Sequence, residues 1–139
     1  MMLVHFPAAL LPVEFIFNVI ANFTSRPELA TVSYYCLMAG VIGGWIAVLS
    51  GLTDLFLYVL RSGESSNTGW KHGTIQFIAI TGFTGILVAE YKSPAIILEL
   101  PLWLVAGKIS LLMMLHIGNY LGGNLVFNTV AKQFRSFKQ

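Results

Sequence analysis

Charged residues are scarce in this chain. They make up 10% of its 139 residues, whereas a soluble globular domain carries about 25%. Hydrophobic residues make up 56%, and the mean hydropathy is +0.76. The few charges lie mostly in short clusters between long apolar runs, a pattern typical of proteins that cross a membrane several times. The chain is far too apolar for a soluble domain, and its net charge of +2 gives no reason to expect nucleic-acid binding.

Cysteine and catalytic motifs are also nearly absent. The single Cys36 excludes a disulfide within the chain. The first apolar run has no basic stretch before it and no small-residue cleavage site after it, so we expect a membrane helix rather than a cleaved signal peptide. No nucleophile–base triad, phosphate-binding loop or closely spaced zinc motif is present. The sequence therefore indicates no enzyme, and at most an electron-transfer component.

Four apolar runs predict an all-α fold, an antiparallel bundle of four transmembrane helices that forms a single integral membrane domain over residues 1–139. The predicted helices cover residues 4–23, 29–60, 70–91 and 94–131. Two small-xxx-small spacings, Gly40 with Gly44 and Gly118 with Gly122, allow another helix to approach closely.

Basic residues favour one side of the membrane. In a four-helix topology the N-terminus, the loop at 61–71 and the C-terminal tail share a side, and the opposite side carries only Arg26 and Lys92. The terminal side carries Arg61, Lys71, Lys132, Arg135 and Lys138. By the positive-inside rule we expect both termini in the cytoplasm of a bacterium, with the chain in its inner membrane.

Three histidines are predicted to lie toward one side of the bilayer. His5 opens the first helix, His72 opens the third, and His116 lies late in the fourth. At a rise of 1.5 Å per residue His116 is about 24 Å from Lys132. It reaches the level of the other two if the last helical turns leave the bilayer, and it lies near the midplane if they do not. Polar groups that converge inside lipid mark a functional site by default.

Such histidines suit a haem or a metal ion. We expect His72 and His116 to be the axial ligands of a haem b, because they come from adjoining antiparallel helices. As the plainer alternative, a histidine at a helix entrance is an interfacial or capping residue.

The residues around this pair are assigned supporting roles. Gly118 and Gly122 would make room for the porphyrin. His5 would bond a propionate or replace one axial ligand. Gln76, one turn after His72, would orient the site.

Charged residues inside the predicted helices form a second candidate site. Glu14 and Lys108 each lie roughly 12–14 Å from the level of the histidines, and opposite charges at matched depth predict a buried ion pair. A structural lock is the plainer interpretation of this pair, and a proton path is the alternative. Asp54, roughly 9 Å from the end of the second helix, would support a histidine or pair with Arg61.

Three short motifs support a family resemblance. They are the His-Phe-Pro at 5–7, the Gly-Leu-Thr-Asp at 51–54 and the Gly-Gly-Asn-Leu-Val-Phe at 122–127. In these motifs the chain resembles a family of small bacterial four-helix membrane proteins of unknown function. It departs from the family by having Phe127 where tyrosine is commoner, and by lacking the usual basic and glycine-rich ending. The resemblance implies the four-helix topology and no activity. A weaker likeness, to haem-b four-helix membrane proteins, rests only on histidines in antiparallel helices.

Two functions from different classes remain open. The first is a membrane protein that binds haem or a metal and transfers electrons. The second is an accessory subunit without a cofactor, which lies in the lipid bilayer and packs against other membrane subunits, or a second copy of itself, through the small-xxx-small faces.

Overall fold

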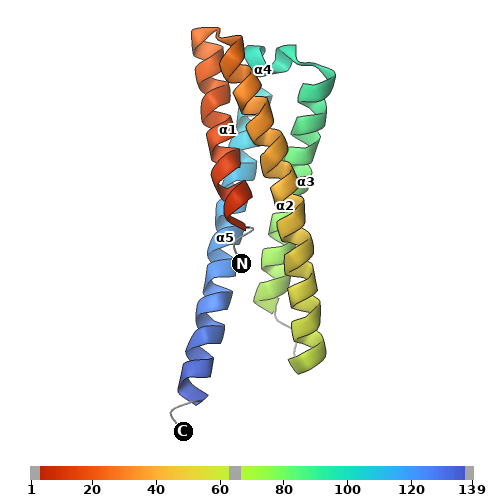
Figure 1. The fold of residues 1–139 in the computed structure, drawn as a ribbon, viewed down its shortest axis with the longest axis vertical. Coiled ribbons are helices and arrows are strands. Elements are labelled where there is room, and N and C mark those ends of the chain that lie inside the picture. The colour runs from red at the N-terminus through yellow and green to blue at the C-terminus, as the bar shows by residue number, and fades with distance from the viewer. Residues whose placement is uncertain (1–3, 63–66, 137–139) are drawn as a thin grey trace.

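The computed structural model describes residues 4–62 and 67–136, apart from the side chains of 58–62, 125–126 and 128–136. The described residues form five α-helices and no strand (Figure 1). These are α1 (His5–Thr24), α2 (Pro27–Ser62), α3 (Asn67–Lys92), α4 (Ala95–Glu99) and α5 (Leu102–Ser136). All but α4 are long and apolar enough to cross a membrane. The predicted all-α antiparallel bundle of four transmembrane helices is confirmed.

The four long helices pack as two pairs. α1 lies along α2, and α3 lies along α5 (Figure 1). α2 joins the pairs by packing against α3, whereas α1 and α5 touch over only a few residues. The boundary between α1 and α5 is therefore the least packed side of the bundle. We call the end at which α4 lies the α4 end, and the opposite end, toward the C-terminus, the terminal end.

Glycines on α2 allow α1 and α3 to pack closely against it. A Cβ atom on Gly40 would lie 2.7 Å from Leu11 Cδ2, and one on Gly43 would lie 3.1 Å from Phe6 Cβ. Gly44 faces Ile80 of α3 in the same way. The small-xxx-small face predicted from Gly40 and Gly44 thus brings helices of the same chain together.

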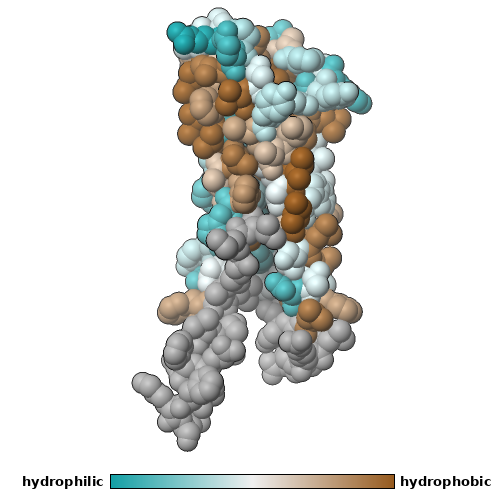
Figure 2. Space-filling model, viewed as in Figure 1, coloured by the Kyte–Doolittle hydropathy of each residue, from teal (hydrophilic) through white to brown (hydrophobic). Residues whose placement is uncertain are grey.

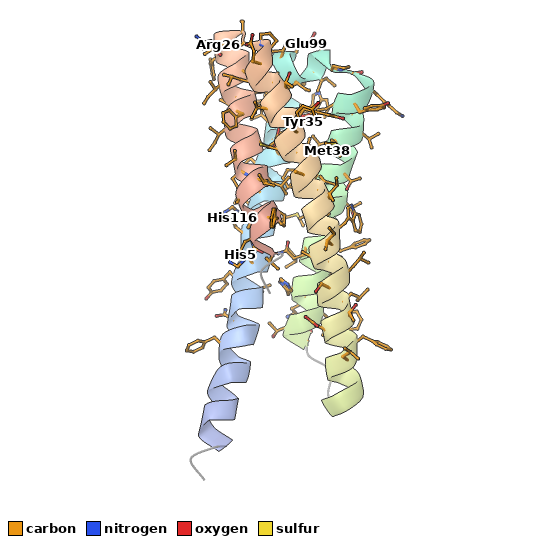
Figure 3. The ribbon with its side chains drawn as sticks, viewed as in Figure 1. His5, Arg26, Tyr35, Met38, Glu99 and His116 are labelled. Carbon is orange, nitrogen blue, oxygen red and sulfur yellow. The ribbon has the colours of Figure 1, made fainter. Side chains whose placement is uncertain are left out.

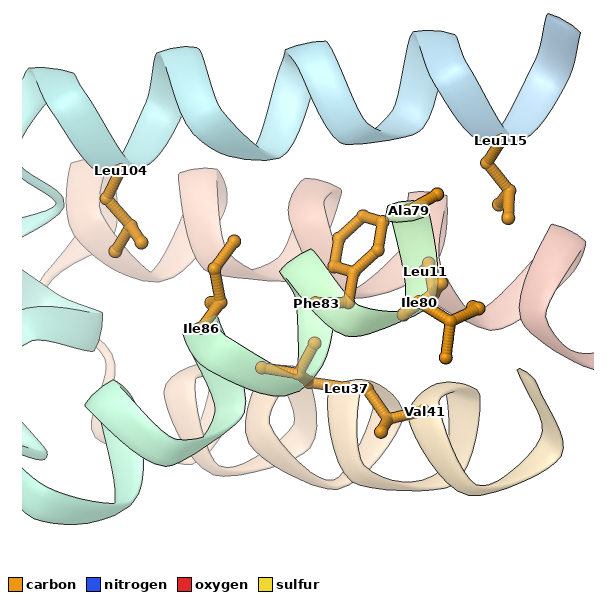
Figure 4. Close-up of a cluster of buried hydrophobic side chains, with 9 residues drawn as sticks. All are labelled: Leu11, Leu37, Val41, Ala79, Ile80, Phe83, Ile86, Leu104 and Leu115. Carbon is orange, nitrogen blue, oxygen red and sulfur yellow. The ribbon is translucent and has the colours of Figure 1, made fainter. Parts of the chain in front are cut away.

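The core lies between the two helix pairs (Figure 4). Its nine buried hydrophobic residues are Leu11, Leu37, Val41, Ala79, Ile80, Phe83, Ile86, Leu104 and Leu115. A hydrogen bond from Trp45 Nε1 of α2 to Thr84 Oγ1 of α3, 3.0 Å long, adds a polar tie between the pairs. Outside the core, large apolar side chains face outward, as expected for a surface in contact with lipid, and hydrophilic residues gather at the α4 end (Figure 2).

The prediction of one continuous helix over 94–131 is wrong. The chain forms α4, leaves the helix at Leu100 and Pro101, and then begins α5. Leu100 adopts a left-handed conformation with φ of 40°, and its N–H donates to Ile96 O. Pro101 has no N–H with which to continue the helix. As a result, α4 lies across one end of the bundle instead of extending α5 (Figure 1).

The other three predicted helices agree with α1, α2 and α3 in position, and their ends differ by only a few residues. Most of the loop predicted at 61–69 is replaced by helix, because α2 continues to Ser62 and α3 begins at Asn67. Residues 63–66 of that loop lie outside the described residues.

Candidate functional site

A cluster of buried polar side chains joins α1, α3 and α5. The Lys108 ammonium donates to Glu14 Oε1 at 2.5 Å and to Glu90 Oε1 at 2.8 Å. Its third hydrogen bond goes to Asn18 Oδ1 at 2.8 Å. All four residues have a solvent exposure of 0%. We call Glu14, Asn18, Glu90 and Lys108 the Lys108 cluster.

Helix geometry brings these side chains together. Glu14 and Asn18 are four residues apart on α1 and therefore share one face. Glu90 lies near the end of α3 and Lys108 near the beginning of α5. Side chains on a helix lean toward its N-terminus, so Glu90 and Lys108, on antiparallel helices, lean toward each other. The cluster connects α1 to α5 on the side of the bundle where these helices otherwise barely touch.

The charges of the Lys108 cluster do not balance when both carboxyl groups are ionised. Two carboxylates then face one ammonium, which leaves an excess negative charge in an apolar surrounding, where charge is costly. Ser33 Oγ of α2 donates to Glu14 Oε1 at 3.1 Å, but this bond brings no charge. Among the described residues, Oε2 of Glu14 and Oε2 of Glu90 have no hydrogen-bond partner. One added proton would neutralise the excess charge.

Helix α4 covers this cluster from one end of the bundle. Asn18 Nδ2 donates to Ile97 O at 2.9 Å, and Asn22 Nδ2 donates to Leu98 O. The Ile97 side chain is buried against Ala21 and Ala30 in a small separate core. The covering helix is therefore held by both amide and apolar contacts to the α1–α2 pair.

Glu14 and Lys108, which the sequence placed at one depth, are in contact. Sequence reasoning missed Glu90, Asn18 and Ser33 as members of the same network. A signal for Glu90 was present, because it continues the buried stripe of α3 formed by Ala79, Phe83 and Ile86 at spacings of four and three. A charged residue in an apolar stripe points into the bundle even when it lies near a helix end.

A second set of polar side chains lies between α3 and α5, toward the terminal end. We call it the His72–Gln76 group. His72 Nδ1 lies 2.6 Å from Gly118 O. Because a carbonyl oxygen can only accept, Nδ1 carries the proton in this contact, and in a neutral ring Nε2 is then the nitrogen with a lone pair. Gln76 Nε2 donates to Asn119 Oδ1 at 2.6 Å, and Gln76 Oε1 has no partner among the described residues.

The glycines opposite these side chains are closely approached by them. A Cβ on Gly122 would lie 2.8 Å from His72 Cε1, and one on Gly118 would lie 3.0 Å from Gln76 Cδ. From the sequence we predicted that a porphyrin would fill this space. In the structure an imidazole ring and an amide occupy it.

The structure does not bring the two predicted axial ligands face to face. His116 is exposed on α5, where its Nδ1 bonds Leu112 O of its own helix at 2.8 Å. It is two residues from Gly118, and therefore lies roughly 160° around the helix from the position that His72 contacts. His5 is exposed at the beginning of α1, at about the height of His116 (Figure 3). No group of three or more His, Cys, Asp or Glu side chains within the described ranges is arranged to hold a metal ion. Haem binding stays a prediction.

A model of a known protein family matches nearly the whole chain. Residues 1–133 match the model of a family described as "Predicted membrane protein (DUF2231)". The chain belongs to the DUF2231 family. The resemblance to a family of small membrane proteins of unknown function is thereby confirmed, and the chain is a membrane protein. No curated protein and no solved structure matches it.

Two further predictions concern Asp54 and the glycines expected to bind another subunit, and the structure describes the surroundings of both. Asp54 is exposed on α2, and the side chain of Arg61, its suggested partner, lies outside the described residues. The prediction that another subunit docks on Gly40/Gly44 and Gly118/Gly122 does not fit the packing. A Cβ on any of these glycines meets a side chain of the same chain, so the faces are already in use.

Proposed function

We propose that this DUF2231 protein binds and releases protons within the membrane, and that the Lys108 cluster is the group that holds them. The observation that carries the proposal is the charge imbalance in a fully buried site. Glu14 and Glu90 share one ammonium, and each keeps one carboxyl oxygen without a hydrogen-bond partner among the described residues. Ionisable residues inside a membrane protein are by default candidates for a functional site, and they form the proton relays of pumps and transporters.

The surroundings favour a proton over a larger ligand. Toward the terminal end the apolar core, including Ile80 and Phe83 of α3, separates the cluster from the His72–Gln76 group. Toward the other end the cluster is covered by α4. A site enclosed in this way exchanges the smallest ligand most easily. With both termini in the cytoplasm, as the basic residues predict, the cluster would lie nearer the outer surface of an inner membrane and exchange protons there.

Infrared spectroscopy tests for the proton directly, because it separates the C=O stretch of a protonated carboxyl group from that of a carboxylate. We expect the wild-type protein in lipid nanodiscs to show a protonated-carboxyl band at neutral pH. Glu14→Gln and Glu90→Gln should each abolish that band, since either change leaves one carboxylate with one ammonium.

Glu28→Gln is the matched control, because Glu28 is an exposed carboxylate in the first turn of α2. This variant should keep the protonated-carboxyl band of the wild type. A wild-type protein with no protonated-carboxyl band would rule the proposal out.

Haem-b binding with an electron-transfer role is the second candidate. It is supported by the hydrogen bond from His72 Nδ1 to Gly118 O. Such a bond fixes the ring and leaves Nε2 as the coordinating atom, as is common for histidines that bind metals. The exposed position of His116 means that a haem held by both residues requires α5 to turn about its axis.

Optical spectra test the haem candidate. Protein purified from haem-replete cells is expected to show a Soret band, and an α band after reduction with dithionite. His72→Ala and His116→Ala should each weaken or shift these bands, whereas His5→Ala should leave the axial ligands in place. If the wild type has no such bands, or if both variants retain them unchanged, the assignment is wrong.

A further inference from the structure

The position of α4 depends on α1. A helix of five residues cannot be stable by itself, and the carbonyl groups of its last turn have no partners within the helix. Asn18 and Asn22, one turn apart on α1, supply donors to two of these carbonyls, at Ile97 and Leu98. The two amide side chains therefore hold α4 over the Lys108 cluster.

Asn18 belongs to the Lys108 cluster and also bonds α4. Its Oδ1 accepts a hydrogen bond from Lys108 Nζ at 2.8 Å, while its Nδ2 donates to Ile97 O at 2.9 Å. The residue has an exposure of 0%, so water does not compete for either bond. A single amide thus connects the ammonium at the centre of the cluster to the backbone of the covering helix.

We infer that Asn18 is a positioning residue that couples the docking of α4 to the charged Lys108. The ammonium fixes the orientation of the amide and polarises it, which strengthens the bond from its N–H to Ile97 O. When the ammonium is absent, the amide is free to turn, and the Ile97 carbonyl loses its donor. α4 then loosens, and water reaches the carboxyl oxygens of Glu14 and Glu90 from the α4 end.

This inference deepens the proposed function, because α4 would control when the Lys108 cluster exchanges protons. The groups that face Lys108 are Glu14 and Asn18 from α1 and Glu90 from α3, and Ser33 of α2 bonds Glu14. Of these side chains, Asn18 is the one that also bonds α4. Asn22 holds α4 by a separate bond to Leu98 O. This difference between the two asparagines allows the coupling to be measured.

Thiol labelling provides the measurement. In a Cys36→Ser background, which removes the native thiol, a cysteine is placed at Ile97, whose exposure is 7%. The protein in lipid nanodiscs is treated with a water-soluble maleimide, and the labelling rate reports how often α4 opens. Asn18→Leu and Lys108→Met should each raise this rate about fivefold, the effect of losing one hydrogen bond.

The double variant tests the coupling. If Asn18 carries the effect of Lys108, combining Asn18→Leu with Lys108→Met should raise the rate no further than either change alone. Asn22→Leu should also raise the rate, but its effect should multiply with that of Lys108→Met, because its bond does not involve the cluster.

Two control positions confirm that the bundle stays folded. A cysteine at Ser93, which is exposed between α3 and α4, should label rapidly in every background. A cysteine at Leu115, which is 2% exposed in the core, should stay unlabelled in every background. A folded Lys108→Met protein with an unchanged rate at position 97, or rates that multiply for Asn18→Leu and Lys108→Met, would overturn the coupling. The labelling does not measure protons, so the coupling can hold even if the proton-binding proposal fails, and the reverse is also true.

Discussion

Lys108→Ala is expected to lower the free energy of unfolding by about 3–5 kcal/mol, the usual cost of removing one partner from a buried ion pair. The change leaves Glu14 and Glu90 without their cation at 0% exposure, and it also removes the bonded neighbour of Asn18. Either the carboxyl groups take up protons or water enters the bundle. Unfolding in mixed detergent micelles, followed by circular dichroism, measures the loss.

The matched variant replaces all three charged residues with apolar residues of similar size: Glu14→Leu, Glu90→Leu and Lys108→Met. Replacement of a complete buried ion-pair network in this way is often neutral or stabilising, so the triple variant should be more stable than Lys108→Ala and close to the wild type. It should nevertheless show no protonated-carboxyl band. A triple variant as unstable as Lys108→Ala would indicate that the Lys108 cluster is chiefly a structural lock.

Gly43→Leu is expected to destabilise the bundle by about 1–3 kcal/mol, the range for overfilling a packed interior. A Cβ on Gly43 already lies 3.1 Å from Phe6 Cβ. Because that atom is attached directly to the backbone of α1, a rotamer change does not relieve the contact. α1 must move away from α2, and a shift of α1 also moves Glu14 away from Lys108. The same unfolding assay measures the effect.

Gly85→Leu serves as the comparison, since nothing lies within 4 Å of a Cβ at this exposed position of α3. It should be neutral or slightly stabilising, because leucine favours helix more than glycine does. Equal losses for Gly43→Leu and Gly85→Leu would show that helix propensity, and not the contact between α1 and α2, decides the outcome.

The sequence was sufficient to predict position along the helices but not rotation about them. The four spans follow from the length and hydropathy of the runs, and the level shared by Glu14 and Lys108 follows from counting the rise per residue. Whether a side chain faces the core depends instead on its angle around the helix. Leu115 and Gly118 are buried, while His116 between them is exposed, and this angle separates the two predicted axial ligands.

The break at residues 100–101 was missed, although Pro101 is a signal for it in the sequence. Pro101 is the eighth residue of the helix predicted over 94–131, and proline beyond the first turn kinks or breaks a helix. The residue before a proline is disfavoured in the helical region, and Leu100 adopts a left-handed conformation there, which leucine rarely does. The hydrogen bonds that Asn18 and Asn22 give to α4 follow from that break, and sequence reasoning therefore missed them as well.

The ionic contact between α1 and α5 has a further consequence for how the protein responds to water. Attraction between charges falls in inverse proportion to the local dielectric constant, whereas apolar contacts lose strength only in proportion to the area exposed. α1 and α5 share few contacts and are joined by buried charges. The first water molecules to enter would weaken this contact far more than their number suggests, and would thereby ease the entry of others. Separation of α1 from α5 is therefore expected to be abrupt, with wetting of this boundary as its trigger.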